Sequence, residues 1–149
     1  MSDMTQISQA IKHYSDAISA LMLRDISQLM DQQFSELTHR QMTILELLGE
    51  RARTVNEIAN HFGITASAAS QIIKKLENTG YVTREINLQN RREILVSLAE
   101  KGKQYRNKMN EIDMYIIRNY YLLLEEPELE QLLNIYKKLY HIAQNKQEA

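Results

Sequence analysis

Apolar side chains recur at intervals of three and four residues over the first part of the chain. The stripe includes Ile7, Ile11, Ile18 and Leu21. This spacing is typical of an amphipathic helix, because residues three or four positions apart share one helical face. We therefore predict one long helix over residues 3–34, whose apolar face needs another chain or a distant helix to cover it.

N-capping residues mark the starts of three shorter helices. Thr38 and Thr54 each precede a Gln or Glu by three residues, which is the spacing of a capping box, and Thr65 can cap a further helix. Glycines suited to helix ends follow the apolar residues of each segment: Gly49, Gly63 and Gly80. The sequence therefore predicts helices that begin after these threonines and end close to these glycines.

The helix after Thr65 is predicted to have one buried and one polar face. Ala69, Ile72, Ile73 and Leu76 stand at positions i, i+3, i+4 and i+7, so they share a face that a core can bury. The side chains on the opposite face are small or polar: Ser67, Ser70, Gln71, Lys74 and Asn78. A helix with such a surface can approach another molecule closely.

The spacing of apolar residues changes from helical to alternating after Gly80. Residues 81–86 and 93–98 are rich in β-branched and aromatic side chains and enclose a polar segment, which predicts a β-hairpin. Helical spacing returns over residues 99–124, and Pro127 suits the first turn of a last helix. The predicted fold class is mainly α with a small β-hairpin (α+β).

The charge distribution shows where an anionic partner would bind. The chain has 149 residues and a net charge of −1, which by itself gives no basic footprint. Residues 51–108, however, contain eleven Lys or Arg and five Glu, a net charge of +6, and the remaining residues carry −7. The middle of the chain is therefore the candidate surface for a polyanion.

The order of elements in residues 54–98 predicts a winged helix-turn-helix. This motif consists of two short helices joined by a turn and followed by a hairpin, here with an arginine-rich tip. Its second helix enters the major groove of DNA, where short polar side chains can read base edges. Arginines of the hairpin, Arg91 and Arg92, could reach a narrow minor groove or its phosphates.

We predict that the DNA-contacting residues lie on the second helix and the hairpin. Ser67, Ser70 and Gln71 are expected near base edges, and Lys74 and Lys75 nearer phosphates. The full predicted set is Thr65, Ser67, Ala68, Ser70, Gln71, Lys74, Lys75, Arg84, Arg91 and Arg92.

Two other interpretations stay open at this point. The polar helix face could be merely solvated, and Arg92 could brace the turn of the hairpin rather than contact DNA. The alternative function is a protein–protein adaptor that uses the winged-helix surface without binding DNA.

The sequence resembles the MarR (multiple antibiotic resistance regulator) family. The order of elements along the whole chain is similar, as are the strings at residues 63–65 and 76–82. The segment 87–92, followed by 95–102, resembles the wing of that family and the start of its next helix. Asn87 and Asn90 stand where the family often has Asp, and Gln71 where a basic residue is common.

This resemblance implies a homodimer and a regulatory ligand. Residues 1–34 and 100–149 would form the helical dimerisation region, and residues 35–99 the DNA-binding lobe. The dimer would bind a palindromic operator, and a small aromatic or phenolic ligand would release it. We expect the protein to act as a repressor. Side chains that could line the ligand crevice are Tyr14, Met22, Met30 and Met42, although Met and Tyr at helical spacing are more often core residues.

Composition and motif spacing argue against other classes of protein. The chain has no Cys, only four Gly and no pair of His at metal-binding spacing, so we expect no enzyme, no cofactor and no metal. No apolar run approaches a membrane span, and residues 1–4 (Met-Ser-Asp-Met) do not open a secretion signal. We therefore expect a cytoplasmic protein with no membrane partner.

Overall fold

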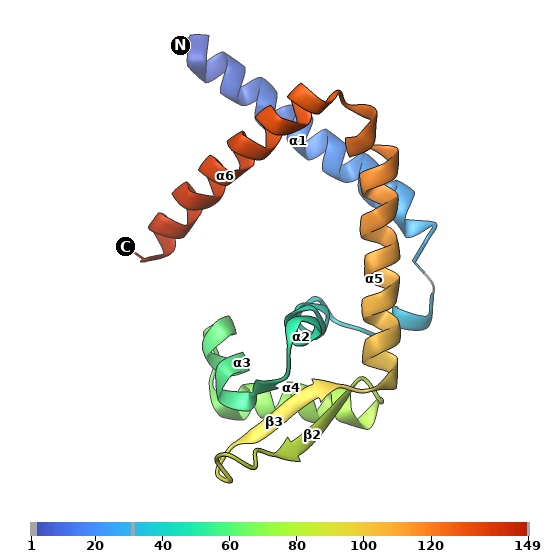
Figure 1. Ribbon diagram of the computed structural model, residues 1–149, viewed down its shortest axis with the longest axis vertical. Helices are drawn as coiled ribbons and strands as arrows, with labels where there is room; N and C mark the ends of the chain where they lie inside the picture. The colour runs from blue at the N-terminus through green and yellow to red at the C-terminus, as the bar shows by residue number, and fades with distance from the viewer. Residues whose placement is uncertain (1–2, 31, 149) are drawn as a thin grey trace. The chain divides into compact units, whose positions relative to one another are not determined.

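The computed structural model describes residues 3–30 and 32–148. The described chain is mostly helical, with a small three-stranded antiparallel sheet (Figure 1). This confirms the predicted fold class. The elements in chain order are α1 (Asp3–Ser27), η1 (Gln32–Phe34), α2 (His39–Glu50), β1 (Arg53–Thr54), α3 (Val55–Phe62), α4 (Ala66–Asn78), β2 (Val82–Ile86), β3 (Ile94–Leu98), α5 (Glu100–Asn119), η2 (Tyr121–Leu123) and α6 (Glu126–Glu148).

The chain divides into two compact units. Residues 1–110 form the first unit and residues 111–149 the second. The first contains α1 to β3 and the first half of α5, and the second contains the rest of α5, η2 and α6. The division into a dimerisation region and a DNA-binding lobe, predicted from the sequence, concerns a dimer and stays a prediction.

The predicted capping boxes are both formed. Thr38 Oγ1 accepts the Gln41 N–H at 3.2 Å, and the Gln41 side chain accepts the Thr38 N–H at 2.9 Å. Thr54 and Glu57 make the same reciprocal pair at 3.1 and 2.9 Å. These bonds satisfy backbone donors that the first turn of a helix leaves without partners, so α2 and α3 start where the sequence predicts.

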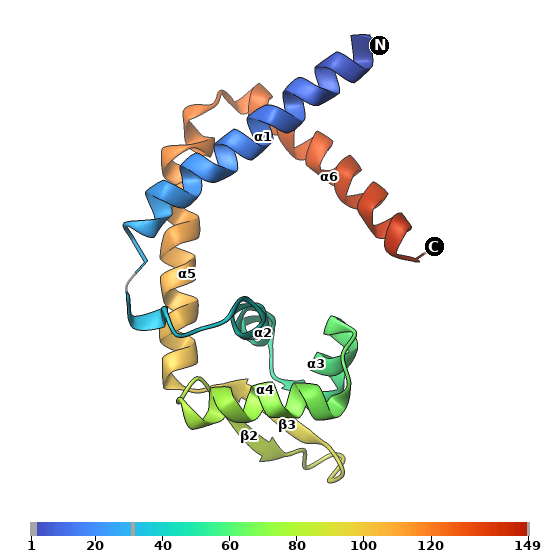
Figure 2. The ribbon, with the colours of Figure 1, turned by 180° about the vertical axis from the view of Figure 1, so that it is seen from behind.

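The core of the first unit is enclosed by α2, α3, α4, the sheet and the start of α5. Its fully buried side chains include Ile44, Ile58, Ile73, Val96 and Tyr105, one from each of these elements. Burying a large aliphatic side chain contributes about 1.5 to 3 kcal/mol, so this cluster is the main source of stability for the elements around it. Figure 2, which is seen from behind the view of Figure 1, shows α4 crossing in front of the two longer strands.

The sheet contains one strand that the sequence pattern did not predict. Its strand order is β1-β3-β2, with all neighbours antiparallel. β1 consists only of Arg53 and Thr54, which pair with Val96 and Leu95 of β3. Two residues are too few to show an alternating pattern, so pattern reasoning finds the β2–β3 hairpin and misses β1.

Two predicted helices are shorter in the structure. α1 ends at Ser27, whose hydroxyl donates to the Arg24 carbonyl, and the backbone then turns through bonds from Leu29 and Met30 to Ile26. The prediction of a helix to residue 34 was therefore wrong. α5 likewise ends at Asn119 rather than at 124, because backbone hydrogen bonds between residues three positions apart tighten the chain into η2.

The two terminal helices expose wide apolar surfaces. Neither α1 nor α6 contains a buried residue among those described. Side chains exposed by about half or more include Ile7, Ile11 and Leu21 in α1 and Leu133 and Tyr140 in α6. None of the helices that the structure describes is long and apolar enough to span a membrane.

Candidate nucleic-acid interface

Helix α4 begins from a tight turn and a threonine cap. Gly63 adopts φ +62°, a left-handed conformation that other residues rarely take, and its N–H is bonded to the last turn of α3. Thr65 Oγ1 then accepts the Ala68 N–H at 3.1 Å. Thr65, a predicted DNA contact, therefore serves as the N-cap of α4 in this structure.

The predicted division of α4 into two faces is confirmed. Ala69, Ile73 and Leu76 are completely buried, and Ile72 is half-buried against the same core. On the opposite side Ser67, Gln71, Lys74, Lys75 and Asn78 are exposed, while Ala68 and Ser70 are half-buried. Neither Lys74 nor Lys75 forms an ion pair with another described residue. This face therefore presents two amides, hydroxyls and two ammonium groups.

Arg84 ties the hairpin to α4 instead of pointing freely outward. Its Nη2 donates to Glu77 Oε1 of α4 at 2.9 Å, and about a third of each side chain is exposed. The hydrogen bond and charge of Arg84 lower the pKa of Glu77, and Glu77 in turn raises the pKa of Arg84. Arg84 was predicted to contact DNA, and the sequence pattern gave no sign of its partner Glu77.

Two asparagines shape the tip of the wing, residues 87–93. The Asn87 side-chain oxygen accepts the Gln89 N–H at 3.1 Å, and that of Asn90 accepts the Arg92 N–H at 3.3 Å. Backbone bonds from Asn90 to Asn87 and from Glu93 to Asn90 close the successive turns. An Asn oxygen accepts such bonds as an Asp oxygen does, so the turn forms with asparagine at both positions.

Arg91 and Arg92 extend from this tip as exposed side chains. Neither takes part in an ion pair among the residues that the structure describes. Arg92 also lines a cavity of about 230 Å³ whose other walls include Ser70 of α4 and Asn56 of α3. The structure thus brings Ser70 and Arg92, two predicted DNA-contacting residues distant in sequence, to one hollow.

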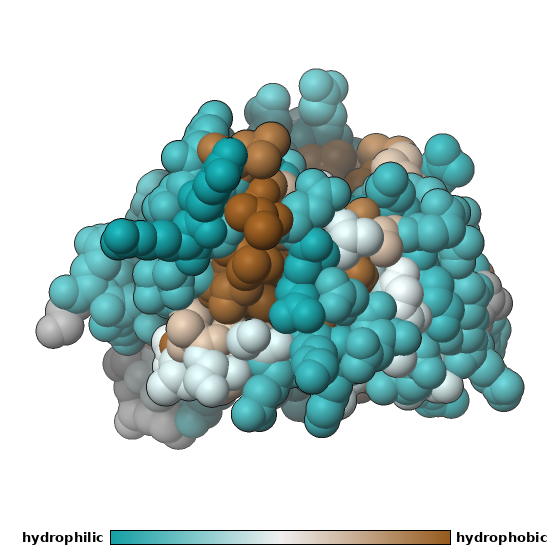
Figure 3. Space-filling view, turned by 90° about the horizontal axis from the view of Figure 1, so that it is seen from below, coloured by the Kyte–Doolittle hydropathy of each residue, from teal (hydrophilic) through white to brown (hydrophobic). Residues whose placement is uncertain are grey.

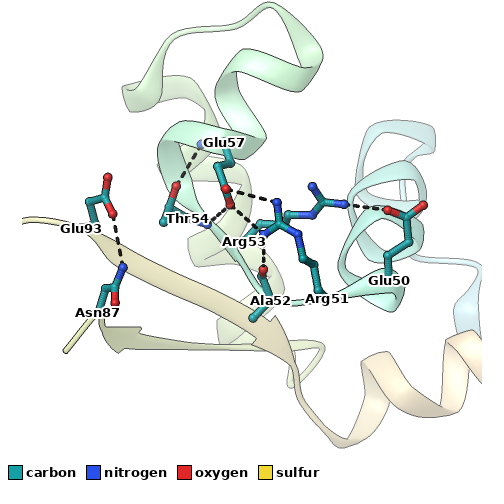
Figure 4. A network of polar contacts seen from close by, with 8 residues as sticks. All are labelled: Glu50, Arg51, Ala52, Arg53, Thr54, Glu57, Asn87 and Glu93. Carbon is teal, nitrogen blue, oxygen red and sulfur yellow. Dashed lines mark hydrogen bonds and ion pairs between the residues drawn. The ribbon is translucent and has the colours of Figure 1, made fainter. Parts of the chain in front are cut away.

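A polar clamp fixes α3 against the end of α2 (Figure 4). Arg51 donates to both carboxylate oxygens of Glu57 at 3.2 and 3.3 Å, and Arg53 donates to Glu50 at 2.6 Å. The Arg51 hydrogen bond and the Thr54 N–H lower the pKa of Glu57. These arginines contribute to the positive charge of residues 51–108 but are held in structural pairs, which the charge count could not show.

A second cluster holds the other end of α4. The Tyr81 hydroxyl donates to Glu36 at 3.0 Å, and Lys101 Nζ lies 3.5 Å from the same carboxylate and 5.1 Å from the centre of the Tyr81 ring. Burial and the Glu36 carboxylate raise the pKa of Tyr81 to about 12. Beside it is a cavity of about 280 Å³ lined in part by Gln41 and Lys75.

None of the four predicted ligand-crevice residues lines either of the two cavities. Tyr14 is 65 % exposed on α1, while Met22 and Met30 are half-buried. Met42 is partly buried against the core of the first unit. Neither the 230 Å³ nor the 280 Å³ cavity includes any of the four, so their role in ligand binding stays a prediction.

Comparison with known proteins finds a family match over most of the winged helix-turn-helix segment. A model of the MarR family matches residues 35–93, the part that contains α2, α3, α4, β2 and the tip of the wing. The chain is 27 % identical over 99 residues to YkoM of Bacillus subtilis, an HTH-type transcriptional regulator. That match covers 66 % of this chain and 64 % of YkoM, so about a third of YkoM lies outside it.

Solved structures share the fold over nearly the whole chain. FabT of Streptococcus pneumoniae, in complex with DNA, has a TM-score of 0.78 and 18 % identity, covering 93 % of this chain and 98 % of FabT. MepR of S. aureus, bound to ethidium bromide, has a TM-score of 0.70 and 23 % identity, covering 88 % and 95 %.

These findings also bear on catalysis. The matched family consists of regulators and not of enzymes, which confirms the prediction that the chain has no catalytic activity. The family match covers residues 54–93 of the segment 54–98, in which the sequence predicted a winged helix-turn-helix, and ends just before β3. Over residues 35–93 the chain is therefore similar to the MarR family, and the relatives that it matches are named as HTH-type transcriptional regulators.

Proposed function

We propose that this protein binds double-stranded DNA through the exposed face of α4 and the wing. The observation that carries the proposal is the pairing of a polar helix face, with Lys74 and Lys75 free of described ion pairs, and a wing with free Arg91 and Arg92. A helix with such a face fits the major groove, and the adjacent minor groove is narrow enough to favour guanidinium groups. The DNA-bound structure of FabT, which shares this fold, supports the assignment.

Within α4, the residues are proposed to divide between bases and phosphates. Gln71, exposed near the middle of the helix, would contact a base edge, and Ser67 and Ser70 would lie close to the groove floor. Ala68 has a small side chain, which would let DNA approach the helix closely. Lys74 and Lys75 would contact phosphates. Thr65 would act through the amide groups of the first turn that it orders, and Arg84 through its charge while it holds Glu77.

A second copy of this chain is proposed to cover the apolar faces of α1 and α6. Both helices exceed 20 residues and bury no described side chain, so a monomer would leave long apolar stripes in water. A twofold dimer places two α4 helices about one DNA turn apart, which matches an inverted-repeat operator. We propose that the dimer acts as a repressor in the cytoplasm, where a prokaryotic chromosome lies.

Selection from a randomised pool of duplexes tests this function directly. The purified protein should enrich an inverted repeat whose half-sites are centred about 10 base pairs apart. Light scattering should give the mass of two chains at micromolar concentration. A pool that stays random after repeated selection would overturn the proposal, and a monomer mass would overturn the dimer.

Replacing Gln71 or Lys74 with alanine should have different effects on binding. Gln71→Ala should lower preference at one base pair of each half-site by about 1 to 3 kcal/mol. Lys74→Ala should weaken binding to all duplexes about equally and lower the salt slope by about 1 for each subunit. Titrations against the selected duplex and its single-base variants measure both effects, and the reverse pattern would contradict the assigned roles.

A small aromatic ligand is proposed to weaken DNA binding. Tyr14, Met22, Met30 and Met42 are the residues proposed to contact it, and the ethidium complex of MepR supports an aromatic ligand for this fold. A ligand acts only through a difference in its affinity for the DNA-competent and incompetent states. Salicylate added to the protein–DNA complex should therefore release DNA, and Met42→Ala should shift the concentration needed. Unchanged DNA affinity at saturating salicylate would exclude phenolic acids of this kind.

A further inference from the structure

Leu88 lies at the tip of the wing with nothing covering it. It is 86 % exposed, the largest exposed fraction of any large hydrophobic side chain in the described part of the chain. Leu88 lies outside the hydrophobic core cluster, so packing of the core does not need an apolar side chain at this position. An isolated exposed leucine needs no explanation by itself, but Leu88 has apolar and cationic neighbours.

The turn holds Leu88 in a defined position. The Asn87 side chain bonds to the Gln89 N–H across Leu88, and the Asn90 N–H bonds to the Asn87 carbonyl. Both bonds span Leu88, because each joins Asn87 before it to a residue after it. The side chain is therefore presented by an ordered turn, and little conformational entropy of the backbone is lost when it is buried against a partner.

The surroundings of Leu88 are apolar behind and cationic beside it. Ile86 and Ile94 face each other across β2 and β3 and are 59 % and 37 % exposed. Arg91 and Arg92 follow in the same turn, free of described ion pairs. Figure 3, which views the molecule from the side on which the hairpin lies nearest, shows hydrophobic side chains gathered in a strip between hydrophilic ones.

This combination fits the minor groove of DNA. The walls of that groove are sugar edges, which are apolar, and its rims are phosphates, which are anionic. Many proteins that bind there contact the groove with arginine or lysine and insert apolar side chains such as leucine or isoleucine between base steps. The tip also belongs to the same face as α4, because Arg92 and Ser70 line one cavity. Charge complementarity and continuity with the proposed interface therefore select DNA over a protein or a lipid surface.

We propose that Leu88 is an apolar wedge that enters the minor groove beside each half-site, where it packs against sugar and base edges while Arg91 and Arg92 contact the flanking phosphates. This inference rests on the proposed function and adds a residue that the DNA-binding predictions did not include. It explains why a leucine that is 86 % exposed occupies a polar turn.

Leu88→Ala, with Gln89→Ala as the matched control in the same turn, tests the wedge. The probe is the duplex recovered from the randomised pool, titrated at several salt concentrations and footprinted with hydroxyl radicals. Leu88→Ala should weaken binding about tenfold, because the apolar contact is lost, and should leave the salt slope unchanged, because no charge is removed. Minor-groove protection beside each half-site should disappear, and Leu88→Met should restore it. Gln89→Ala should bind like the original protein.

The outcomes separate this inference from the proposed function. A protein that selects an operator but binds it equally well with Leu88→Ala would overturn the wedge alone, as would an equal loss from Gln89→Ala. A protein that selects no sequence would overturn both. Because Leu88 is exposed, its replacement should not shift the thermal midpoint, and a shifted midpoint with intact protection would assign Leu88 to folding instead.

Discussion

Gly102→Ala should lower the free energy of unfolding by about 3 kcal/mol, because no space exists for the added methyl group. A Cβ at Gly102 would lie 2.2 Å from the Tyr81 carbonyl oxygen and 3.0 Å from Leu98 Cδ2. Neither group can move easily. Tyr81 is completely buried, and its carbonyl accepts the Ala99 N–H at 2.9 Å at the start of α5. Urea unfolding followed by circular dichroism measures the change.

Gly49→Ala is the matched control for this substitution. Gly49 also lies in a helix, and its added Cβ would meet only the Arg106 side chain, at 2.7 Å from Nε. That side chain is flexible, and alanine favours a helix by about 1 kcal/mol over glycine, so the stability should change little. Both variants are compared at one protein concentration, because dimerisation adds to the apparent stability. Equal stability of Gly102→Ala and the original protein would contradict the close contact.

Removing both wing arginines should have the largest effect on DNA binding. The double variant Arg91→Ala/Arg92→Ala removes four cations from a dimer, so the slope of log affinity against log salt should fall by about 3 to 4. Affinity for the selected duplex should fall about 100-fold at physiological salt, because four phosphate contacts and their released counterions are lost. Anisotropy titrations of a labelled duplex at four salt concentrations measure both quantities.

The control for the wing is a double variant with the same change in charge. Lys137→Ala/Lys138→Ala removes two exposed lysines of α6 that are not placed at DNA. If only net charge matters, the two double variants will lose affinity alike, and the role assigned to the wing would be refuted. Light scattering should give the mass of two chains for both variants.

Local signals made most of the structure of residues 35–99 predictable. Capping boxes at Thr38 and Thr54 set the starts of α2 and α3, because each is a bond between residues three positions apart. The buried face of α4 followed from the spacing of Ala69, Ile73 and Leu76. Such features depend on neighbours in the sequence, so one sequence is enough to find them.

Features that depend on distant residues could not be predicted. β1 exists because Arg53 and Thr54 meet the middle of β3, more than 40 positions away. Arg84 and Arg51 looked like free cations in the charge count, and the structure pairs them with Glu77 and Glu57. A charge count shows that a segment is basic, but only three-dimensional contacts show which cations are free to bind phosphate.

The wing shows the same limit in its finer detail. Sequence reasoning took Arg91 and Arg92 as its functional side chains, because guanidinium groups bind phosphates. It passed over Leu88, since an apolar residue in a turn gives no local signal of function. Its exposure and the bonds that fix it became visible only in the folded hairpin.

A binding titration against two duplexes at two salt concentrations tests the central claim most directly. The protein is titrated with the DNA upstream of its own gene and with a scrambled duplex of equal composition, at about 50 and 200 mM salt. We predict that it binds the natural region at least about 1,000-fold more tightly, with affinity for both falling steeply as salt rises. Equal and weak binding to the two duplexes would contradict a sequence-specific regulator and leave only a basic surface.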